Sequence, residues 1–524
     1  MMLSLYSISY LASLFFAIFW SFFDVRGRKF WAWIPKIGFF LATGFYLFNV
    51  FYNAEYAETN IVVLLIRDLG LLHILTWLTT KVAIKKSWFG LWFMGLLGGM
   101  MWLYAPAVLE KSFSKHKLGG EETTVVAQLE VPIDQNGELL FDIKDENKLK
   151  DIQQALAGYE VNIQRAFPEM AHPERTNLDE YYVVDIADQY ENKVVEVFNQ
   201  LQGMTSMIDW VEYNEIVSVD PLESNKLPKN QIKYVIDDER VNELWGFEWM
   251  KMNDTYKFLN EAKIKPTKVA KIAILDTGVD GQHPDLKDNY VTTLKKYDSD
   301  KRGHGTHCAG IAGAVSNNKI GVASYAPNND FVQITSIKVL SDYGFGSQQG
   351  IINGMIKAAD IGADVLSMSL GGRSNDMAQR AYNDAVKYAN KANAIVVVAA
   401  GNSNMSAKEF TPANCEGVIT VSAVDSDLNR AKFSNTIDDV KMGIAAPGVD
   451  ILSTYPGGDY QVFSGTSMAT PYVAGLLGMM KAVNPKITTK EAYEILKDTG
   501  IETTDTQKTG NFIQPLKVLE QVID

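Results

Sequence analysis

Residues 268–278 read KVAKIAILDTG, an apolar run that stops at an acidic residue and a turn. A run of this kind is typical of a strand that is buried on both faces of a sheet. Residues 394–400 form a second such run, which ends just before Asn402, and residues 365–370 form a third. Helical patterns such as residues 378–390 lie between the strands. This alternation predicts an α/β fold in which helices cover both faces of a parallel sheet.

Polar side chains gather where these strands end. In parallel sheets the residues just past the carboxyl ends of the strands line the ligand crevice. Asp276 and Asn402 occupy such places. His304 and Ser467 each precede a run of small residues that suits a tightly packed helix. The sequence therefore predicts one site that contains all four residues.

These residue types suit nucleophilic catalysis. A serine hydroxyl needs a base to take its proton, and an imidazole base needs a carboxylate to orient it. We expect Asp276 to orient the base, His304 to act as general base and acid, and Ser467 to be the nucleophile. The Ser467 N–H and the Asn402 side chain then serve as oxyanion donors.

Four motifs carry a specific family resemblance. They are DTGVDGQHPDL, HGTHCAG, AAGNSN and GTSMATP, which begin at residues 276, 304, 399 and 465. Together they resemble the subtilisin-like serine peptidases (subtilases, S8), over about residues 245–520. The resemblance implies a subtilisin-like domain over residues 245–524 and an endopeptidase that works through an acyl-enzyme.

The resemblance also implies the substrate groove. Ser369, Leu370 and Gly371 are similar to the family's strand that pairs with the substrate backbone. Tyr472 stands where the family usually has a histidine, outside the triad. Phe410 lies near the usual floor of the side-chain pocket, and its bulk predicts a shallow pocket.

A structural calcium site is a weaker expectation. Asp285 and a loop that contains Asn318 resemble the family's principal calcium site, and carboxylate, amide and carbonyl oxygens suit Ca²⁺. The alternative is an ordinary turn with a capping aspartate. No cofactor is expected to be required for catalysis.

The first 118 residues predict an all-α membrane region of four helices. Four apolar runs, residues 1–23, 30–52, 61–80 and 88–109, are each about long enough to cross a ~30 Å hydrocarbon core. The third run contains Arg67, Asp68 and His73. We interpret Arg67 and Asp68 first as a charge pair packed between helices, and the alternative is a sensing or relay site.

Charges in the loops predict the orientation. The loops at residues 24–29 and 81–87 each hold three basic residues, whereas residues 53–60 hold none. Basic loops stay in the cytoplasm. We therefore expect a multi-pass integral membrane protein that contacts the lipid bilayer and places its catalytic domain on the extracytoplasmic side.

An acidic segment separates the membrane region from the peptidase. Residues 121–225 hold 23 acidic and six basic residues. Strand patterns at 123–131, 180–186 and 208–219 and helical patterns at 147–156 and 193–201 predict a small ferredoxin-like α+β domain, residues 121–220. Residues 221–244 then form a linker. By its position the domain resembles the family's inhibitory propeptide, which implies a zymogen whose partners are its own propeptide domain and a protein or peptide substrate.

Composition excludes nucleic-acid binding and a disulfide-stabilised fold. The whole chain carries a net charge of −13, and no part after residue 120 has the basic surplus that nucleic-acid binding needs. The two cysteines, Cys308 and Cys415, exclude a disulfide framework.

Two alternative functions stay open. One is a metal hydrolase built on His304, His307 and Cys308, with His283 nearby in sequence. A catalytically silent membrane receptor that binds peptides on a peptidase fold is the other alternative.

Overall fold

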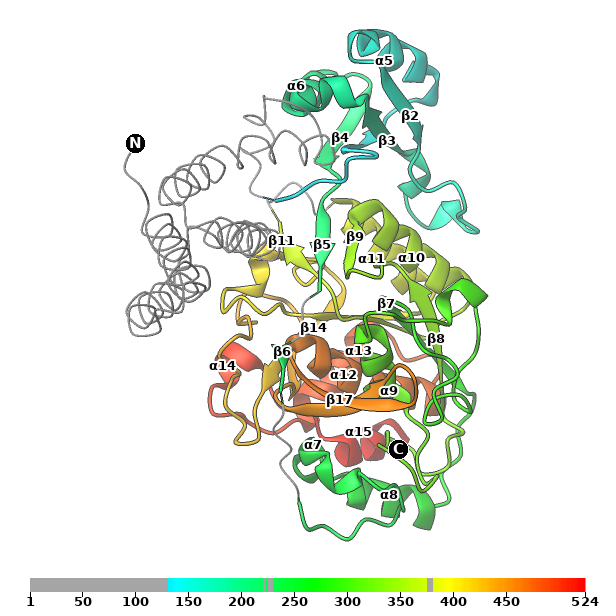
Figure 1. The fold of residues 1–524 in the computed structure, drawn as a ribbon, viewed down its shortest axis with the longest axis vertical. Helices are drawn as coiled ribbons and strands as arrows, with labels where there is room; N and C mark the ends of the chain where they lie inside the picture. Colours follow the sequence, from blue (N-terminus) through cyan, green and yellow to red (C-terminus); the bar gives the residue numbers. More distant parts are fainter. Residues whose placement is uncertain (1–130, 220–221, 225–229, 375–379, 524) are drawn as a thin grey trace, which may run out of the picture. The chain divides into compact units, whose positions relative to one another are not determined.

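The computed structural model describes residues 131–219, 222–224, 230–374 and 380–523 (Figure 1). All of them belong to one compact unit, Glu122–Asp524. The expected membrane region, residues 1–118, lies outside the described residues. Within the described ranges, no helix is both long and apolar enough to cross a bilayer.

The first described part is a small domain with one antiparallel sheet and two helices. The strands lie in the order β2-β3-β1-β4. In chain order the elements are β1 (Leu139–Ile143), α5 (Leu149–Ala155), β2 (Val161–Arg165), β3 (Tyr181–Ile186), α6 (Val194–Gly203) and β4 (Ile208–Tyr213). The pattern at residues 123–131 falls almost wholly outside the described residues. In its place β1 lies in the middle of the sheet.

The sequence does not predict strand β1, because both faces of this strand are buried. Leu139 and Phe141 pack with the small domain's own helices. Leu140 instead belongs to a core shared with the part of the chain that resembles a peptidase, here called the peptidase part, which follows from residue 230. All five residues of β1 are buried, so the strand lacks the alternation of a half-exposed strand.

The peptidase part is built on a six-stranded parallel sheet in the order β15-β14-β12-β10-β7-β8. This confirms the predicted parallel sheet. The strands are β7 (Ala270–Asp276), β8 (Val332–Lys338), β10 (Val365–Met368), β12 (Ile395–Ala399), β14 (Val418–Val424) and β15 (Gly443–Pro447).

Helices cover both faces of this sheet, as predicted (Figure 1). Along β7, Ile272 and Ile274 face one core, and Ala273 and Leu275 face the other. The first core is covered mainly by α9 (His304–Gly313), α12 (Thr466–Val483), α8 (Met252–Glu261), α13 (Thr489–Thr499) and α15 (Pro515–Ile523). The second is covered by α10 (Gln348–Asp360) and α11 (Arg380–Lys391).

Small residues let α12 lie close to the sheet and to α9. A Cβ on Gly478 would lie 2.7 Å from Ile272 Cδ1, and a Cβ on Gly475 would lie 2.7 Å from the Ala312 carbonyl oxygen. Real side chains do not approach so closely. The run of small residues therefore brings the first turn of α12, with Ser467, next to α9.

Short elements surround the sheet. They are α7 (Trp245–Trp249), α14 (Thr506–Thr509), β5 (Ile216–Ser218), β6 (Leu222–Glu223), β9 (Phe345–Ser347), β11 (Gly372–Arg373), β13 (Phe410–Thr411), β16 (Ile451–Tyr455) and β17 (Asp459–Ser464). The described residues of the expected linker are not detached from the peptidase part, because Tyr234 and Ile236 are buried in its core.

Candidate active site

Asp276 and His304 form a buried pair at the carboxyl end of β7. The His304 Nδ1 atom lies 2.8 Å from each oxygen of the Asp276 carboxylate. Asp276 is the last residue of β7, and His304 is the first residue of α9. Gly303, with φ of +86°, directs the chain into α9, where a Cβ would lie 2.0 Å from the Tyr455 ring. Asp300 holds this turn by accepting the Gly303 N–H at 2.9 Å.

The Asp276 carboxylate makes His304 a stronger base than its burial alone would allow. Burial lowers the pKa of the ring, but the charge of Asp276 and its hydrogen bond raise it further, so the pKa of His304 lies above its ordinary value. The other ring nitrogen, Nε2, is buried and has no hydrogen-bond partner among the described residues. This nitrogen is the one available for a proton transfer.

Ser467 lies in the first turn of α12, the helix that packs against α9. Its Oγ donates to the Ser369 carbonyl at 3.2 Å rather than to His304. The thiol of Cys308, one turn along α9 from His304, lies 3.5 Å from the Ser467 carbonyl oxygen. Rotation about the Cα–Cβ bond of Ser467 would move the Oγ away from the Ser369 carbonyl without changing the backbone of Ser467 or His304.

Asn402 follows β12 and is held by its side-chain oxygen. Its Oδ1 accepts from both the N–H and the Oγ1 of Thr466, each at 2.9 Å. In a planar amide these contacts point the NH₂ group away from Thr466. Asn402 and Ser467 line one groove, so the remaining donor is available to a ligand in that groove.

The groove contains all three expected substrate-binding residues and a segment that the sequence did not place there. Phe410, which is buried, lies among the lining residues, as expected for a pocket floor. Ser218 and Val219, from the end of the small domain, line the groove as well. The full lining is Ser218, Val219, Ser369, Leu370, Gly371, Gly372, Arg373, Ala399, Gly401, Asn402, Ser403, Phe410, Thr466 and Ser467.

Asp285 and Asn318 lie together, but the carboxylate is already saturated with hydrogen bonds. Asp285 accepts from Asn318 Nδ2 at 2.7 Å, from the Val322 N–H at 2.8 Å and from the Tyr460 hydroxyl at 3.2 Å. Burial raises the pKa of Asp285 to about 7. A calcium ion needs oxygen ligands, and the Asn318 oxygen instead accepts the Ile320 N–H. The residues as they lie do not fit calcium.

The residues of the rival metal site do not all come together. His307 Nε2 lies 3.1 Å from the Ile451 and Gln461 carbonyl oxygens, and burial lowers the pKa of His307 to about 3. His283 contacts the backbone of Asp459 and Asp285. Among the described residues, Asp276, His304 and Cys308 form the one group whose ligand atoms could share a metal ion. Two of its members already bond to each other, and burial holds the pKa of the Cys308 thiol well above its usual range.

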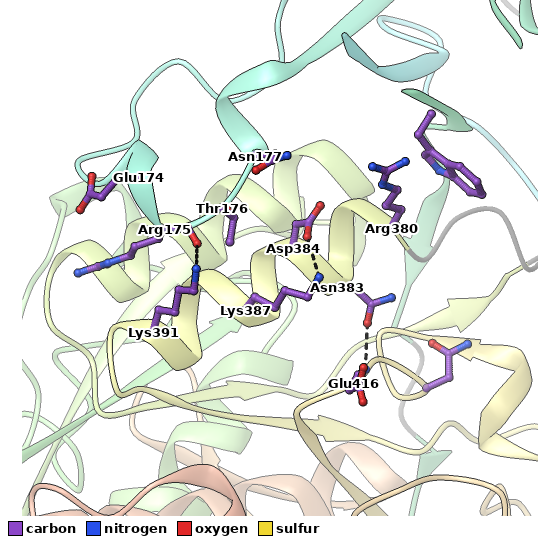
Figure 2. A pocket seen from close by; sticks show the side chains of 12 residues that line it. Glu174, Arg175, Thr176, Asn177, Arg380, Asn383, Asp384, Lys387, Lys391 and Glu416 are labelled. Carbon is purple, nitrogen blue, oxygen red and sulfur yellow. Dashed lines mark hydrogen bonds and ion pairs between the residues drawn. The ribbon is translucent and has the colours of Figure 1, made fainter. Parts of the chain in front are cut away.

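Another hollow lies between the small domain and α11, and Ser467 is not among its lining residues (Figure 2). Arg380 packs over the Trp210 ring at 5.6 Å and pairs with Asp142 at 3.2 Å. Lys387 pairs with Asp384 at 3.2 Å across one turn of α11. Because these groups are already paired, we interpret the hollow as a polar gap at the interface of two packed parts rather than as a second site.

Comparisons with known proteins agree with the peptidase geometry. The model of the subtilase family, peptidase S8, matches residues 267–515. Thermitase of Thermoactinomyces vulgaris is 44% identical over 216 residues, which are 40% of this chain and 74% of thermitase. Subtilisin DY of Bacillus licheniformis is 39% identical over 236 residues, 44% of this chain and 82% of that protein. A solved protease structure from Pseudoalteromonas arctica is 26% identical, covers 55% of this chain and 99% of that chain, and has a TM-score of 0.49.

Proposed function

The chain belongs to the subtilase family and is a serine-type endopeptidase, and on that premise we propose that Asp276, His304 and Ser467 form its catalytic triad. The observation that carries the assignment is the buried Asp276–His304 pair, with its 2.8 Å contacts and its unpartnered Nε2. A carboxylate that holds one ring nitrogen leaves the other free to take a proton.

Each step of the reaction has a group to perform it. His304 Nε2 takes the proton of Ser467 Oγ while the oxygen bonds to the substrate carbonyl carbon. The Ser467 N–H, at the start of α12, and the Asn402 NH₂ donate to the oxyanion that forms. His304 then gives the proton to the departing amine, and a water molecule repeats the sequence to release the acyl group. These steps use only side chains and water.

The substrate is an extended segment of a protein or peptide. Ser369, Leu370 and Gly371 follow β10 and line the groove beside Ser467. A peptide in the groove gains main-chain hydrogen bonds from strand edges and specificity from side-chain pockets. Phe410 in the lining predicts that small or medium side chains enter the pocket more easily than large ones.

We also propose that residues 121–220 form a ferredoxin-like propeptide domain that keeps the enzyme a zymogen. One face of its sheet shares an apolar core with the peptidase helices. Leu140, Tyr181 and Val183 of the small domain belong to the same buried cluster as Ile352 of α10 and Tyr382 of α11. Burial of this much apolar surface favours a docked domain over a detached one.

Hydrogen bonds at two helix starts support this docking. The Glu212 carboxylate accepts from Gln348 Nε2 at 3.0 Å and from the Ala381 N–H at 3.3 Å. Asn214 Oδ1 accepts the Gln349 N–H at 3.0 Å. Side chains of β4 and the residue after it therefore satisfy groups at the first turns of α10 and α11, where helix N–H groups lack intrahelical partners.

The membrane region is proposed on the sequence alone. Four apolar runs within residues 1–118 support a multi-pass anchor, and the basic loops support an extracytoplasmic peptidase. Calcium at Asp285 and Asn318 is not part of the proposal, because an ion there would have to displace the Asn318 and Tyr460 hydrogen bonds. We expect a chelator to leave the peptidase activity unchanged.

Turnover of an unfolded protein tests the proposed function. We expect Ser467→Ala to abolish hydrolysis and to leave the thermal unfolding transition unchanged, because a buried hydroxyl is replaced by a smaller group at a helix start. Hydrolysis that survives in Ser467→Ala would contradict the assignment. Binding without turnover in both proteins would favour the silent receptor.

A further inference from the structure

One charged side chain lines the groove beside Ser467. Among the described residues of the lining, Arg373 alone carries a charge, and the others are apolar or neutral polar residues. An arginine guanidinium stays positively charged at every physiological pH. A peptide that binds in the groove therefore meets one fixed positive charge.

The pairing of β11 with β13 places Arg373 at the pocket next to the oxyanion donor. The two strands are antiparallel, and Arg373 lies opposite Phe410 (Figure 1). Side chains of directly opposite residues share one face of a sheet, with Cβ atoms about 5 Å apart. The Phe410 ring lies against Gly401, where a Cβ would be 3.2 Å from Phe410 Cδ1, and Asn402 is the next residue. Phe410 is buried and Arg373 is exposed, so Arg373 lies at the rim of the pocket whose floor is Phe410.

The ion pair that Arg373 already makes leaves donors for a ligand. Its guanidinium lies 3.2 Å from the Glu409 carboxylate, and the two side chains are 55% and 42% exposed. An ion pair between side chains this exposed contributes little stability. A guanidinium has five N–H donors, and this pair is the one side-chain contact of Arg373 among the described residues. Glu409 itself does not line the groove.

The pocket suits a side chain of medium length that ends in a carboxylate. Phe410 makes the pocket shallow, and Leu370 and Ala399 add apolar surface to the groove. A glutamate has two methylene groups that can contact apolar surface. Its carboxylate can accept two parallel N–H···O bonds from a guanidinium. A basic side chain would instead be repelled by Arg373.

The residue that enters this pocket is the one immediately before the cut bond. In the proposed mechanism Asn402 donates to the carbonyl oxygen of that residue. Its side chain is attached one carbon away from this carbonyl. The pocket beside Asn402 is therefore the nearest one that this side chain can enter.

We propose that Arg373 gives the peptidase a preference for substrates with an acidic residue, above all glutamate, immediately before the cut bond. The proposal rests on the proposed peptidase function and deepens it by naming a substrate class. Arg373 takes no part in the bond changes at Ser467. It stabilises the bound carboxylate and so determines which peptides are cut fastest.

Two matched peptides test this preference. They are identical except for glutamate or glutamine immediately before the cut bond, so they differ in charge but hardly in shape. The full chain is purified in detergent, and kcat/KM is measured for both peptides. We expect wild type to prefer the glutamate peptide by about fivefold, the upper end for an exposed ion pair. Because the ratio of the two values is taken within one protein, differences in folding or in the active fraction cancel.

Three variants assign the preference to Arg373. In Arg373→Gln the ratio should fall to about one or below, because Glu409 is left without its cation. In Glu409→Gln the ratio should rise above that of wild type, because a competing carboxylate is removed. The matched control is Lys408→Gln, which removes an exposed positive charge beside Glu409 but outside the lining, so its ratio should stay as in wild type. Raising the salt from about 0.1 M to about 1 M should lower the wild-type ratio towards one.

The outcomes separate this inference from the proposed function. A wild-type ratio of one, or a preference that survives in Arg373→Gln, would overturn the role of Arg373. A fall in Lys408→Gln as large as that in Arg373→Gln would overturn it too, because the preference would then reflect the general charge around the groove. In all of these cases the peptides are hydrolysed and the peptidase function stands. Hydrolysis of neither peptide by any of the proteins would contradict the peptidase function itself.

Discussion

At the scale of single residues, the candidate site lacks one hydrogen bond, the one between Ser467 Oγ and His304 Nε2. Asp276 orients His304, Thr466 orients Asn402, and both arrangements are already made in the folded chain. Ser467 instead donates to the Ser369 carbonyl. The Ser467 hydroxyl therefore has to leave the Ser369 carbonyl before the proposed base can take its proton.

Replacement of Asn402 tests the oxyanion assignment. We expect Asn402→Ala to lower kcat by about 10²–10³-fold, the range that loss of one such donor has cost in a relative of this family, with little change in KM. Asn402→Asp keeps an acceptor for Thr466 but removes the donor, so it should lose at least as much. Steady-state hydrolysis of a short peptide measures both. An unchanged kcat in Asn402→Ala would show that the side chain does not contact the oxyanion.

The pH dependence of Ser467 labelling tests the state of His304. The base must be neutral to accept the serine proton, and Asp276 raises the pKa of His304 above 6.5 although burial opposes it. The rate of fluorophosphonate labelling should therefore rise with pH, with a midpoint above 6.5. A midpoint below 6.5 would mean that Asp276 does not stabilise the charged ring.

At the scale of elements, docking of the small domain depends on buried carboxyl groups. Burial raises the pKa of Glu212 to about 8. Burial also raises the pKa of Asp142 to about 7, although Arg380 opposes this. Docked carboxyls with raised pKa values bind protons more tightly than free ones, so docking takes up protons. Docking is therefore strongest at low pH and weakens as the pH rises from about 4.5 to about 8.

Replacement of Glu212 by glutamine tests the predicted direction of this pH dependence. Glutamine is neutral at every pH and has nearly the same shape as a protonated glutamate. We expect inhibition of wild type to weaken between pH 6 and pH 8 and inhibition of Glu212→Gln to change less, measured as the rate of Ser467 labelling at each pH. Glu196→Gln, an exposed change on α6 of the same domain, is the matched control. Inhibition that strengthens with pH in wild type would contradict the account.

The sequence predicts some elements better than others for a physical reason. The strand at β7, the turn at Asp276 and the helix at His304 form patterns within short segments, so they can be read locally. β1 lacks alternation because both of its faces are buried. The pairings of β5 with β9 and of β6 with β17 join residues that are far apart in the sequence. No local pattern indicates which edge a short strand will join.

The same distinction holds inside the candidate site. Asp276, His304, Asn402 and Ser467 stand in recognisable motifs, so the resemblance implies a role for each. Ser218 and Val219 carry no motif, and only the folded structure places them in the groove beside Ser467. The Asp285–Asn318 pair shows the converse, since the motif is present but the side chains satisfy each other.

At the scale of the whole molecule, the chain combines an apolar N-terminal region, an acidic small domain and a peptidase. The small domain and the peptidase share one buried core, so a cut between them would not by itself release the small domain. If the small domain is an inhibitory propeptide, as proposed, activation needs undocking or further proteolysis in addition to a cut. The proposed membrane anchor predicts that an uncut chain, 58.3 kDa, stays in the bilayer.

The measurement that tests the central claim most directly is fluorophosphonate labelling of membrane and soluble fractions, read by gel mass. Wild type and Ser467→Ala are compared. We predict labelling of a wild-type band in membranes and no labelling of Ser467→Ala. Labelling that persists in Ser467→Ala, or that is absent from both proteins, would contradict the assignment of Ser467 as the nucleophile of this peptidase.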